Sequence, residues 1–209
     1  MKLSSVYKAF KNGRVVPALL WRLNNLGLTI SLYFVFREQE VKTDSETPDQ
    51  LLQTCVPGFL SKGDLDEVVQ LNPEANQDRM LLRLDAGHLC FGIKKEGRLL
   101  AYMWCDLEEF NYPPCRHRLA PNEAYLYDAW VSTECRGLGM APFMRYESYK
   151  AMGEYSRDQF LSYSDYYNGS AIRFKQKLKA RKNALYIYFN LRDKIVYNWK
   201  LKDYSKENN

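Results

Sequence analysis

The stretch TECRGLGMA, residues 133–141, places an arginine before two glycines in a chain that has only 11 glycines among 209 residues. The strand-like run AYLYDAWVS (124–132) precedes it, and Pro142 opens a run with helical spacing. A glycine turn between a strand and a helix is suited to holding a phosphate, because free N–H groups and the helix dipole point at the anion. Proline is tolerated in the first helical turn, where its missing donor has no intrahelical partner. The stretch therefore predicts an anion-binding turn at the start of a helix.

Two common nucleotide-binding motifs do not fit this turn. A P-loop ends in Gly-Lys-Ser/Thr, whereas Gly139 is followed by Met140 and Ala141. A dinucleotide-binding GxGxxG fingerprint lies near a first strand, whereas this turn lies two-thirds of the way along the chain and has proline at position 142. Neither motif therefore explains the turn.

Hydrophobic patterns divide the rest of the chain into short helices and strands. Gly97 in KKEGR (94–98) gives the clearest hairpin turn, and Asn168 is a favoured N-cap for a short helix. The expected helices are 17–26, 48–56, 65–84, the run after Pro142 and the run after Asn168. The expected strands are 29–36, 88–93, 99–107, 124–132, 160–167, 184–191 and 195–201, with a loop at 111–123.

Hairpins are mixed with helices along the chain, so the sheet is expected to be mixed as well. We expect an α/β (α+β) fold, in which a largely antiparallel sheet of six to seven strands is flanked by helices. The length of 209 residues and the hydrophobic content of 46% allow one substantial core. Residues 1–28 are expected to form an N-terminal helical arm and residues 29–209 the main domain.

The net charge of +5 is unevenly distributed. Residues 171–209 hold eleven Lys and Arg against three acidic residues, which suits an anionic partner such as a nucleotide phosphate, although a solvated basic face is the commoner explanation. Nucleic-acid binding through RFKQKLKARK (173–182) is an alternative. It is disfavoured, because alternating basic residues spread around a helix and no nucleic-acid motif accompanies them.

Cysteine and histidine usage argues against a metal site, since the five cysteines form no CxxC pair and the two histidines are far apart. An odd cysteine count without a signal peptide is typical of a reducing compartment, so a cytoplasmic location is expected. The apolar stretch 16–37 is interrupted by Arg22, Asn24 and Asn25, which makes it a poor membrane-spanning helix. The arm is expected to pack on its own sheet or on a second subunit in preference to a membrane surface.

The pattern Arg136-x-x-Gly139-x-Ala141 resembles the R/Q-x-x-G-x-G/A signature of the GNAT superfamily of acyl-coenzyme-A-dependent N-acyltransferases. LYDAWVSTECRG (126–137) is similar to the family's fourth strand, whose backbone pairs with the pantetheine arm, and NGSAIRFKQKL (168–178) is similar to its Asn-led helix. The resemblance, which covers about residues 29–200, implies acetyl-CoA as co-substrate, with its pyrophosphate on the amides of the turn. The implied cofactor-binding residues are Val131, Thr133, Arg136, Gly137, Leu138, Gly139, Met140, Ala141, Asn168 and Ala171.

The chain departs from the family pattern on the Asn-led helix. Many relatives carry a tyrosine seven residues after the asparagine, which protonates the departing thiolate, but this position is Lys175. Lys175 could itself donate a proton or bind a phosphate, but a lysine on a helix is most often exposed, so we expect Lys175 to be exposed. Tyr166 and Tyr167, just before the helix, are the candidate acids in its place.

Acyl transfer to an amine needs a neutral nitrogen, and an alkylammonium group has a pKa of about 10. Asp128 is the candidate base, because it lies on the strand leading into the turn and matches an acidic position of amine-acetylating relatives. The alternative is that Asp128 is structural and bonded to the backbone. Glu108 and Glu109 are rivals that are expected to be solvated, and a backbone N–H near Val131 is expected to polarise the thioester.

Other nucleophiles and bases are not required. Direct attack by the amine needs no covalent intermediate on Cys135, and His88 and His117 are expected to be structural or exposed. The favoured function is transfer of an acetyl or other short acyl group to a primary amine of a small molecule, with no nucleic-acid partner, by a monomer or homodimer. The alternative is a non-catalytic acyl-CoA-binding or sensing module, and a carrier-protein donor stays open.

Overall fold

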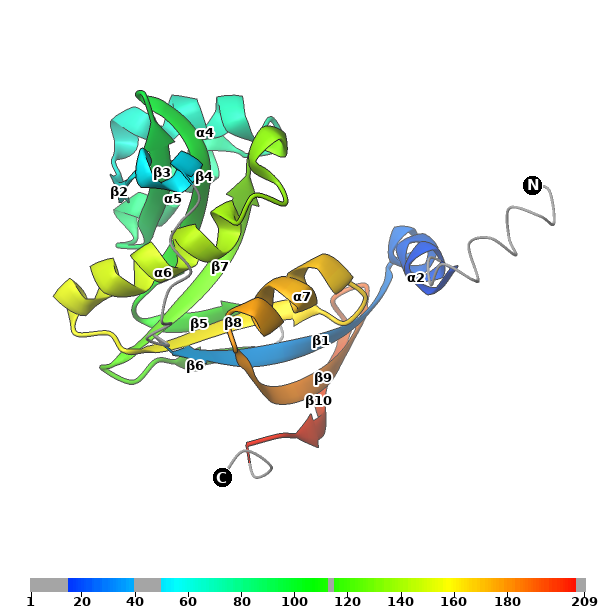
Figure 1. Ribbon diagram of the computed structural model, residues 1–209. Coiled ribbons are helices and arrows are strands. Elements are labelled where there is room, and N and C mark those ends of the chain that lie inside the picture. The colour runs from blue at the N-terminus through cyan, green and yellow to red at the C-terminus, as the bar shows by residue number, and fades with distance from the viewer. Residues whose placement is uncertain (1–14, 40–49, 113–114, 206–209) are drawn as a thin grey trace.

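The computed structural model describes residues 15–39, 50–112 and 115–205. Its centre is an eight-stranded sheet with the order β10-β9-β1-β8-β7-β4-β3-β2 (Figure 1). All neighbouring strands are antiparallel except β7 and β8, which are parallel. The strands are β1 (Leu28–Gln39), β2 (Val56–Leu60), β3 (Leu89–Lys95), β4 (Arg98–Asp106), β7 (Glu123–Val131), β8 (Gln159–Asp165), β9 (Arg181–Leu191) and β10 (Ile195–Asp203), with a separate hairpin of β5 (Glu109–Tyr112) and β6 (Cys115–Arg118). The predicted fold class, a mixed and largely antiparallel sheet flanked by helices, is confirmed.

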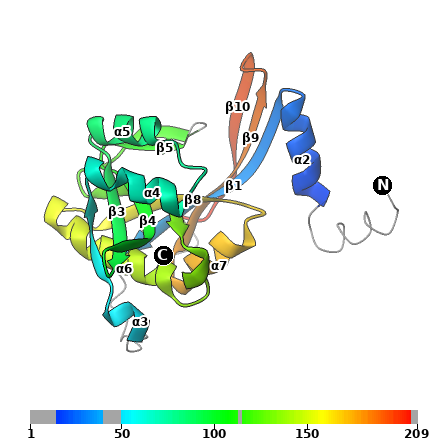
Figure 2. The same cartoon turned by 90° about the horizontal axis from the view of Figure 1, so that it is seen from above.

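The helices are α2 (Val15–Asn25), α3 (Gln50–Gln53), α4 (Leu65–Leu71), α5 (Gln77–Asp85), α6 (Met140–Met152) and α7 (Gly169–Lys177). Helices α4 and α5 cover one face and α6 the other face of the half of the sheet that holds β3, β4 and β7, whereas α7 lies over β1 and β8 (Figures 1 and 2). Helix α6 packs Met144 against Leu126 of β7 on one face. On the other face, α4 and α5 bury Val68 and Met80 against Trp104 of β4. Alternate residues of β7 therefore belong to two different cores.

Several elements differ from the sequence prediction. The sheet has an eighth strand, β2, at its edge. It was not predicted, because Pro57 and Gly58 are typical of a turn, but proline is tolerated on an edge strand. The predicted loop at 111–123 contains β6 and the end of β5. The predicted helix 65–84 is divided into α4 and α5 at Asn72 and Pro73, and the helix at 48–56 is reduced to α3.

The N-terminal segment enters the centre of the sheet. Strand β1 lies between β8 and β9 and pairs with both of them. Helix α2 precedes it and lies outside the layers of the sheet (Figure 1). The predicted stop of this helix at Gly27 is confirmed, since Gly27 has a φ of +84° and its N–H donates to the carbonyl of Asn24 at 2.9 Å. Residues 1–14 of the predicted arm, and residues 48–49 of the predicted helix 48–56, lie outside the described residues.

Candidate functional site

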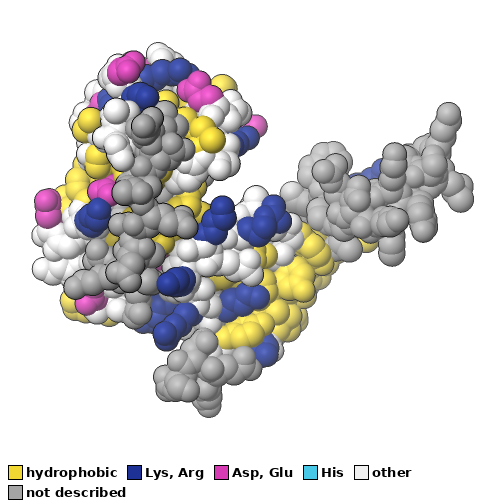
Figure 3. Space-filling model, viewed as in Figure 1, with side chains coloured by type: hydrophobic (Ala, Val, Ile, Leu, Met, Phe, Trp, Pro, Cys, Tyr) yellow, Lys and Arg dark blue, Asp and Glu magenta, His cyan; other side chains and the backbone are white. Residues whose placement is uncertain are grey.

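Strands β7 and β8 separate along their length. Their pairing is limited to residues 123–125 of β7 and 159–161 of β8. Beyond this point β7 stays with β4 up to Val131, whereas β8 stays with β1 up to Asp165. The facing edges of the two strands are therefore left without a ladder partner among the described residues. Figure 3 shows a notch between the two lobes of the molecule, with Lys and Arg side chains at its floor.

A β-bulge lies in β7 where the strands separate. Tyr127 is opposite Trp104 and Trp130 is opposite Tyr102, so Asp128 and Ala129 together face a single residue of β4. Asp128 has a φ of +49°, an uncommon conformation for a residue other than glycine. Bulges of this kind redirect the backbone and the side chains of a strand. The bulge thus redirects the backbone groups of β7 where the opening between β7 and β8 begins.

The glycine turn leads from β7 into α6 as predicted. Gly137 and Gly139 have φ values of +85° and +80°. The N–H groups of Arg136 and Leu138 make long bonds of 3.4 Å to carbonyls within the turn. Within the described part of the chain, no protein acceptor bonds to the N–H groups of Gly137, Gly139, Met140 or Ala141. These four donors, together with the positive end of the α6 dipole, are suited to holding an anion.

Arg136 and Val131 tie the turn to the end of the strand. Arg136 Nε donates to the carbonyl oxygen of Val131 at 3.3 Å, and its guanidinium lies 5.4 Å from the ring centre of Trp130. Thr133 begins the short 3₁₀ turn between strand and glycines, and Leu138 is exposed. Their positions leave the inner part of the turn open, since a Cβ atom added at Gly137 would meet nothing within 4 Å.

Asn168 and Ala171 lie on the other arm of the opening, at the start of α7. The Oδ1 atom of Asn168 accepts the N–H of Ala171 at 3.0 Å and the hydroxyl of Ser170 at 2.8 Å. The predicted N-cap is therefore confirmed. These contacts are made within the helix start, so any role in cofactor binding stays a prediction.

The candidate base Asp128 holds a cation. Its Oδ2 lies 2.6 Å from Nη1 of Arg83 on α5, and its side chain is 44% exposed. The guanidinium of Arg83 lies 5.1 Å from the ring centres of both Trp104 and Tyr127. One oxygen of Asp128 is thus engaged with a fixed guanidinium, a partner that the sequence did not predict.

The candidate acids Tyr166 and Tyr167 follow the end of β8 and are 42% and 45% exposed. The ring of Tyr166 stacks on Phe34 with centres 5.4 Å apart, and its N–H donates to the carbonyl of Leu32 at 2.8 Å. Both tyrosine side chains are therefore partly exposed, between the end of β8 and the start of α7.

Lys175 is buried, so the expectation that it is exposed was wrong. Only 3% of the residue is exposed, and its Nζ lies 2.5 Å from Oε1 of Glu38 and donates to the hydroxyl of Ser162. Glu38 comes from β1 and Ser162 from β8, which are neighbours in the sheet. Both side chains reach Lys175 of α7 only because these two strands lie side by side. The sequence therefore showed an unusual residue at position 175 without showing its partner.

Two cations surround the single carboxylate of Glu38. Arg145 Nε lies 3.5 Å from its Oε2, and the hydroxyl of Tyr149 donates to the same oxygen. Burial by itself would raise the pKa of Glu38, but Arg145 and Lys175 outweigh it and hold the pKa at about 2. Burial lowers the pKa of Lys175 to about 8, with Glu38 opposing the change and Arg145 adding to it. This cluster carries more positive than negative charge in the interior.

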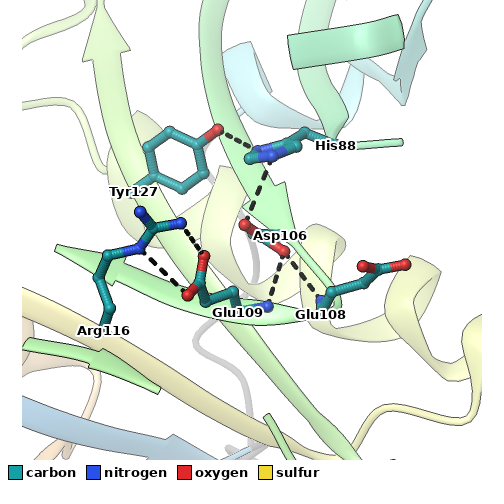
Figure 4. A network of polar contacts seen from close by, with 6 residues as sticks. All are labelled: His88, Asp106, Glu108, Glu109, Arg116 and Tyr127. Atoms are coloured by element: carbon teal, nitrogen blue, oxygen red, sulfur yellow. Dashed lines mark hydrogen bonds and ion pairs between the residues drawn. The ribbon is translucent and has the colours of Figure 1, made fainter. Parts of the chain in front are cut away.

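A second polar network lies near the middle of β7 (Figure 4). His88 Nδ1 lies 2.7 Å from the hydroxyl oxygen of Tyr127, and His88 Nε2 lies 3.4 Å from Oδ2 of Asp106. The other oxygen of Asp106 accepts the N–H groups of Glu108 and Glu109 at 2.8 and 3.0 Å. His88 is therefore fixed between a carboxylate and a phenol, and sequence reasoning missed both partners.

The carboxylates of the predicted rivals lie at the edge of this network. Glu109 is bonded to Arg116 through two contacts of 2.6 and 3.1 Å, and these hydrogen bonds lower its pKa. Glu108 contributes its backbone N–H. Cys135 is buried, with 4% of the residue exposed. Among the described residues, no group of three or more His, Cys, Asp or Glu is placed to hold a metal ion, and no helix is long and apolar enough to cross a membrane.

A cavity of about 740 Å³ lies beside the end of β7, on the face covered by α4. Three glutamates and one arginine line it, together with the ring of Trp130. The charged lining residues are Glu67, Glu96, Glu134 and Arg98. Arg98 Nη2 is 3.1 Å from Oε1 of Glu134, and Lys94 is paired with Glu67 at 2.6 Å. The lining residues carry more negative than positive charge. The neighbouring turn, in contrast, offers N–H groups that attract an anion.

No family model matches the sequence, and no curated protein is similar to it in sequence. A GNAT-family acetyltransferase from Colwellia psychrerythraea superposes with a TM-score of 0.57 and 16% identity, over 78% of this chain and 57% of that one. A tandem GNAT protein from the clavulanic acid biosynthesis pathway gives 0.56 and 12%, over 88% and 58%. A protein of unknown function from Staphylococcus epidermidis ATCC 12228 gives 0.56 and 9%, over 85% and 68%.

This chain thus spans between 57% and 68% of the length of these three structures. At identities of 9–16%, the likeness is informative about fold and not about substrate. The protein has the fold of the GNAT acetyltransferases.

Proposed function

We propose that this protein is an N-acyltransferase that moves an acetyl or other short acyl group from acyl-CoA to a primary amine of a small molecule by direct attack. The observation that carries the proposal is a set of four N–H groups between Gly137 and Ala141 that have no acceptor among the described residues, at the start of α6 and after a strand with a free edge. A diphosphate fits these donors, because glycine lets it approach the backbone and the helix dipole favours its charge. Acetyl-CoA, when bound, supplies the acyl group as an activated thioester.

Different groups around the opening between β7 and β8 have different roles in the proposed reaction. The free edge of β7 between Tyr127 and Val131 offers backbone groups to an extended arm, as an edge strand offers them to a peptide. In this proposal, a backbone N–H at or after the bulge polarises the thioester carbonyl. The amine nitrogen forms a bond to the acyl carbon as the carbon–sulfur bond breaks, so one proton must leave the amine and one must reach the thiolate. Tyr166 and Tyr167 are the donors we propose for the thiolate, since the ammonium of Lys175 is held by Glu38.

The acceptor class follows from the acidic cavity beside Trp130. Three glutamates and one arginine favour a cationic ligand over an anionic one, and an alkylammonium group is cationic near neutral pH. The lining of the cavity includes Thr133 and Glu134, so the cavity lies next to the turn that we propose for the donor.

Binding and turnover of the purified protein test the proposal. We expect acetyl-CoA to bind in calorimetry, and release of free thiol to be observed with at least one member of a panel of primary amines that includes polyamines, amino sugars and amino acid derivatives. Failure to bind acetyl-CoA would rule the proposal out.

A non-catalytic acyl-CoA-binding module is the second candidate, and the buried ion pair of Lys175 favours it, because the usual tyrosine acid is absent. Tight binding of acetyl-CoA without turnover of any amine would decide for this candidate.

A further inference from the structure

Three residues from separate elements form a continuous hydrogen-bonded and electrostatic chain beside the opening (Figure 4). Asp106 ends β4, His88 precedes β3 and Tyr127 lies in β7. The side chain of Asp106 is 6% exposed and that of His88 is 19% exposed. Water is therefore largely excluded from the inner end of the chain, while Tyr127 is only half-buried.

The contacts of Asp106 determine which ring nitrogen of His88 carries a proton. The carboxylate of Asp106 accepts two backbone N–H groups, and its other oxygen lies 3.4 Å from Nε2 of His88, where it favours a proton on that nitrogen. Nδ1 of the neutral ring is then an acceptor, and the hydroxyl of Tyr127 donates to it over 2.7 Å. The oxygen of Tyr127 keeps free lone pairs with which it can accept a hydrogen bond from a ligand.

Tyr127 lies where β7 begins to separate from β8. It lies two residues beyond Tyr125, where pairing with β8 ends, and immediately before the bulge at Asp128. Its side chain lies on the same face of the sheet as Trp130, which lines the acidic cavity. The cavity and the side chain of Tyr127 therefore lie on the same face of the sheet.

Other charged groups near this chain are already engaged. Arg83 lies over the ring of Tyr127 and pairs with Asp128, and Arg116 pairs with Glu109. Cys105 of β4 is a further titratable neighbour, and burial raises its pKa to about 12. Burial also raises the pKa of Tyr127, so the phenol passes a proton on without becoming a free phenolate. Within this cluster, the imidazole of His88 contacts both Tyr127 and Asp106.

We propose that Tyr127, His88 and Asp106 form the route by which the acceptor ammonium group loses its proton. The N–H bond of the ammonium breaks as its proton passes to the oxygen of Tyr127, and the original hydroxyl proton passes to Nδ1 of His88. The amine is left neutral, and the imidazolium that forms faces the carboxylate of Asp106. Tyr127 is the catalytic residue, and His88 and Asp106 act through it. This route rests on the proposed function.

The first test needs no activity. The chain has two histidines, so the ring nitrogens of His88 and His117 can be assigned by ¹⁵N NMR with one single-residue variant. We expect His88 to carry its proton on Nε2 at pH 8, and Tyr127→Phe to move the Nδ1 resonance of His88 while leaving His117 unchanged. A proton on Nδ1 would overturn the proposal, because Tyr127 would then be the acceptor.

The second test is kinetic. Near pH 7 we expect His88→Gln and Tyr127→Phe to lower kcat/KM for the amine about 100-fold, a typical effect of losing a general base, without changing acetyl-CoA affinity. The loss should shrink towards pH 10, where a growing fraction of the amine is already neutral in solution. His117→Gln is the matched control, because His117 lies exposed on β6 and stacks on Phe110.

The outcomes separate the two proposals. A loss of equal size at all pH values, or the same loss in His117→Gln, overturns the relay and leaves the transferase function standing. If acetyl-CoA binds and no amine is turned over, the transferase function fails and the relay fails with it as a catalytic route.

Discussion

At the scale of single residues, Glu38 shows how a charge is kept in the interior. The side chain is fully buried and contacts Lys175, Arg145, Tyr149 and Ser162. Buried ions are tolerated only when they are paired and hydrogen-bonded. Nε and Nη1 of Arg145 lack hydrogen-bond partners among the described residues. The carboxylate of Glu38 is therefore the main group that offsets the burial of the Arg145 and Lys175 charges.

Removing this carboxylate should be costly. We expect Glu38→Gln to lower the free energy of unfolding by about 3–5 kcal/mol, because it leaves Lys175 and Arg145 without an anion. Urea unfolding followed by circular dichroism measures the change. Arg37→Gln is the control on the same strand, since Arg37 forms a half-exposed pair with Glu123 and should change stability by less than about 1 kcal/mol. Equal losses in both variants would contradict the structural role of the cluster.

The same cluster predicts a pH dependence with two limbs. The pKa of Glu38 is about 2 in the fold, below its ordinary value of 4.5, so its stabilisation is complete above pH 4.5 and is lost as the pH falls towards 2. The pKa of Lys175 is about 8, below its ordinary value of 10.5. The unfolded chain therefore binds more protons between these values, and Lys175 contributes increasing stability as the pH rises from 8 to 10.5.

Variants isolate the two limbs from other titrating groups. Subtracting the stability of Lys175→Met from that of the wild type should give a difference that rises between pH 8 and 10.5, whereas Lys177→Met, on the exposed side of the same helix, should give a flat difference. The corresponding difference for Glu38→Gln should shrink below pH 4.5. A flat profile for Lys175→Met would show that the buried ammonium is not destabilised.

At the scale of elements, the turn from β7 into α6 could be predicted because its chemistry is local. Glycines, a following proline and the strand before them lie within one short stretch, and Gly137 and Gly139 have the positive φ values that such a turn requires. The edge strand β2 and the β5–β6 hairpin could not be predicted in this way. Pro57 and Gly58 suggest a turn, and only their pairing with β3 shows a strand, while β6 is recognised only by its pairing with β5.

A pair of glycine variants separates folding from binding at this turn. Gly137 and Gly87 both have a φ of +85°, and a Cβ atom added at either meets nothing within 4 Å. Replacing either by alanine should therefore cost a similar 1–2 kcal/mol of stability for a left-handed residue. Only Gly137→Ala should also weaken acetyl-CoA binding, by about tenfold, because it shifts the N–H groups of the turn. Equal affinities in the two variants, measured by calorimetry, would argue against an anion site here.

At the scale of the whole molecule, the position of β1 was not accessible from sequence. The run 29–36 has the residues of a buried strand, and this prediction is confirmed, but its pattern does not say which strands it pairs with. The structure places it between β8 and β9, which follow it by more than 100 residues. Strand order depends on such distant pairings. Glu38 could not be matched with Lys175 for the same reason.

Truncation tests this central position of β1. A chain that starts at Gly27 keeps β1 and loses α2, which lies outside the sheet, so we expect it to unfold cooperatively at a somewhat lower temperature. A chain that starts at residue 40 loses the only described link between β8 and β9 and also Glu38, so we expect no cooperative thermal transition by circular dichroism. Adding a peptide of residues 28–39 should restore a transition, because the free edges of β8 and β9 then regain their partner. A cooperative melt of the shorter chain without the peptide would show that β8 and β9 pair without β1, and that this strand order is not needed for the fold.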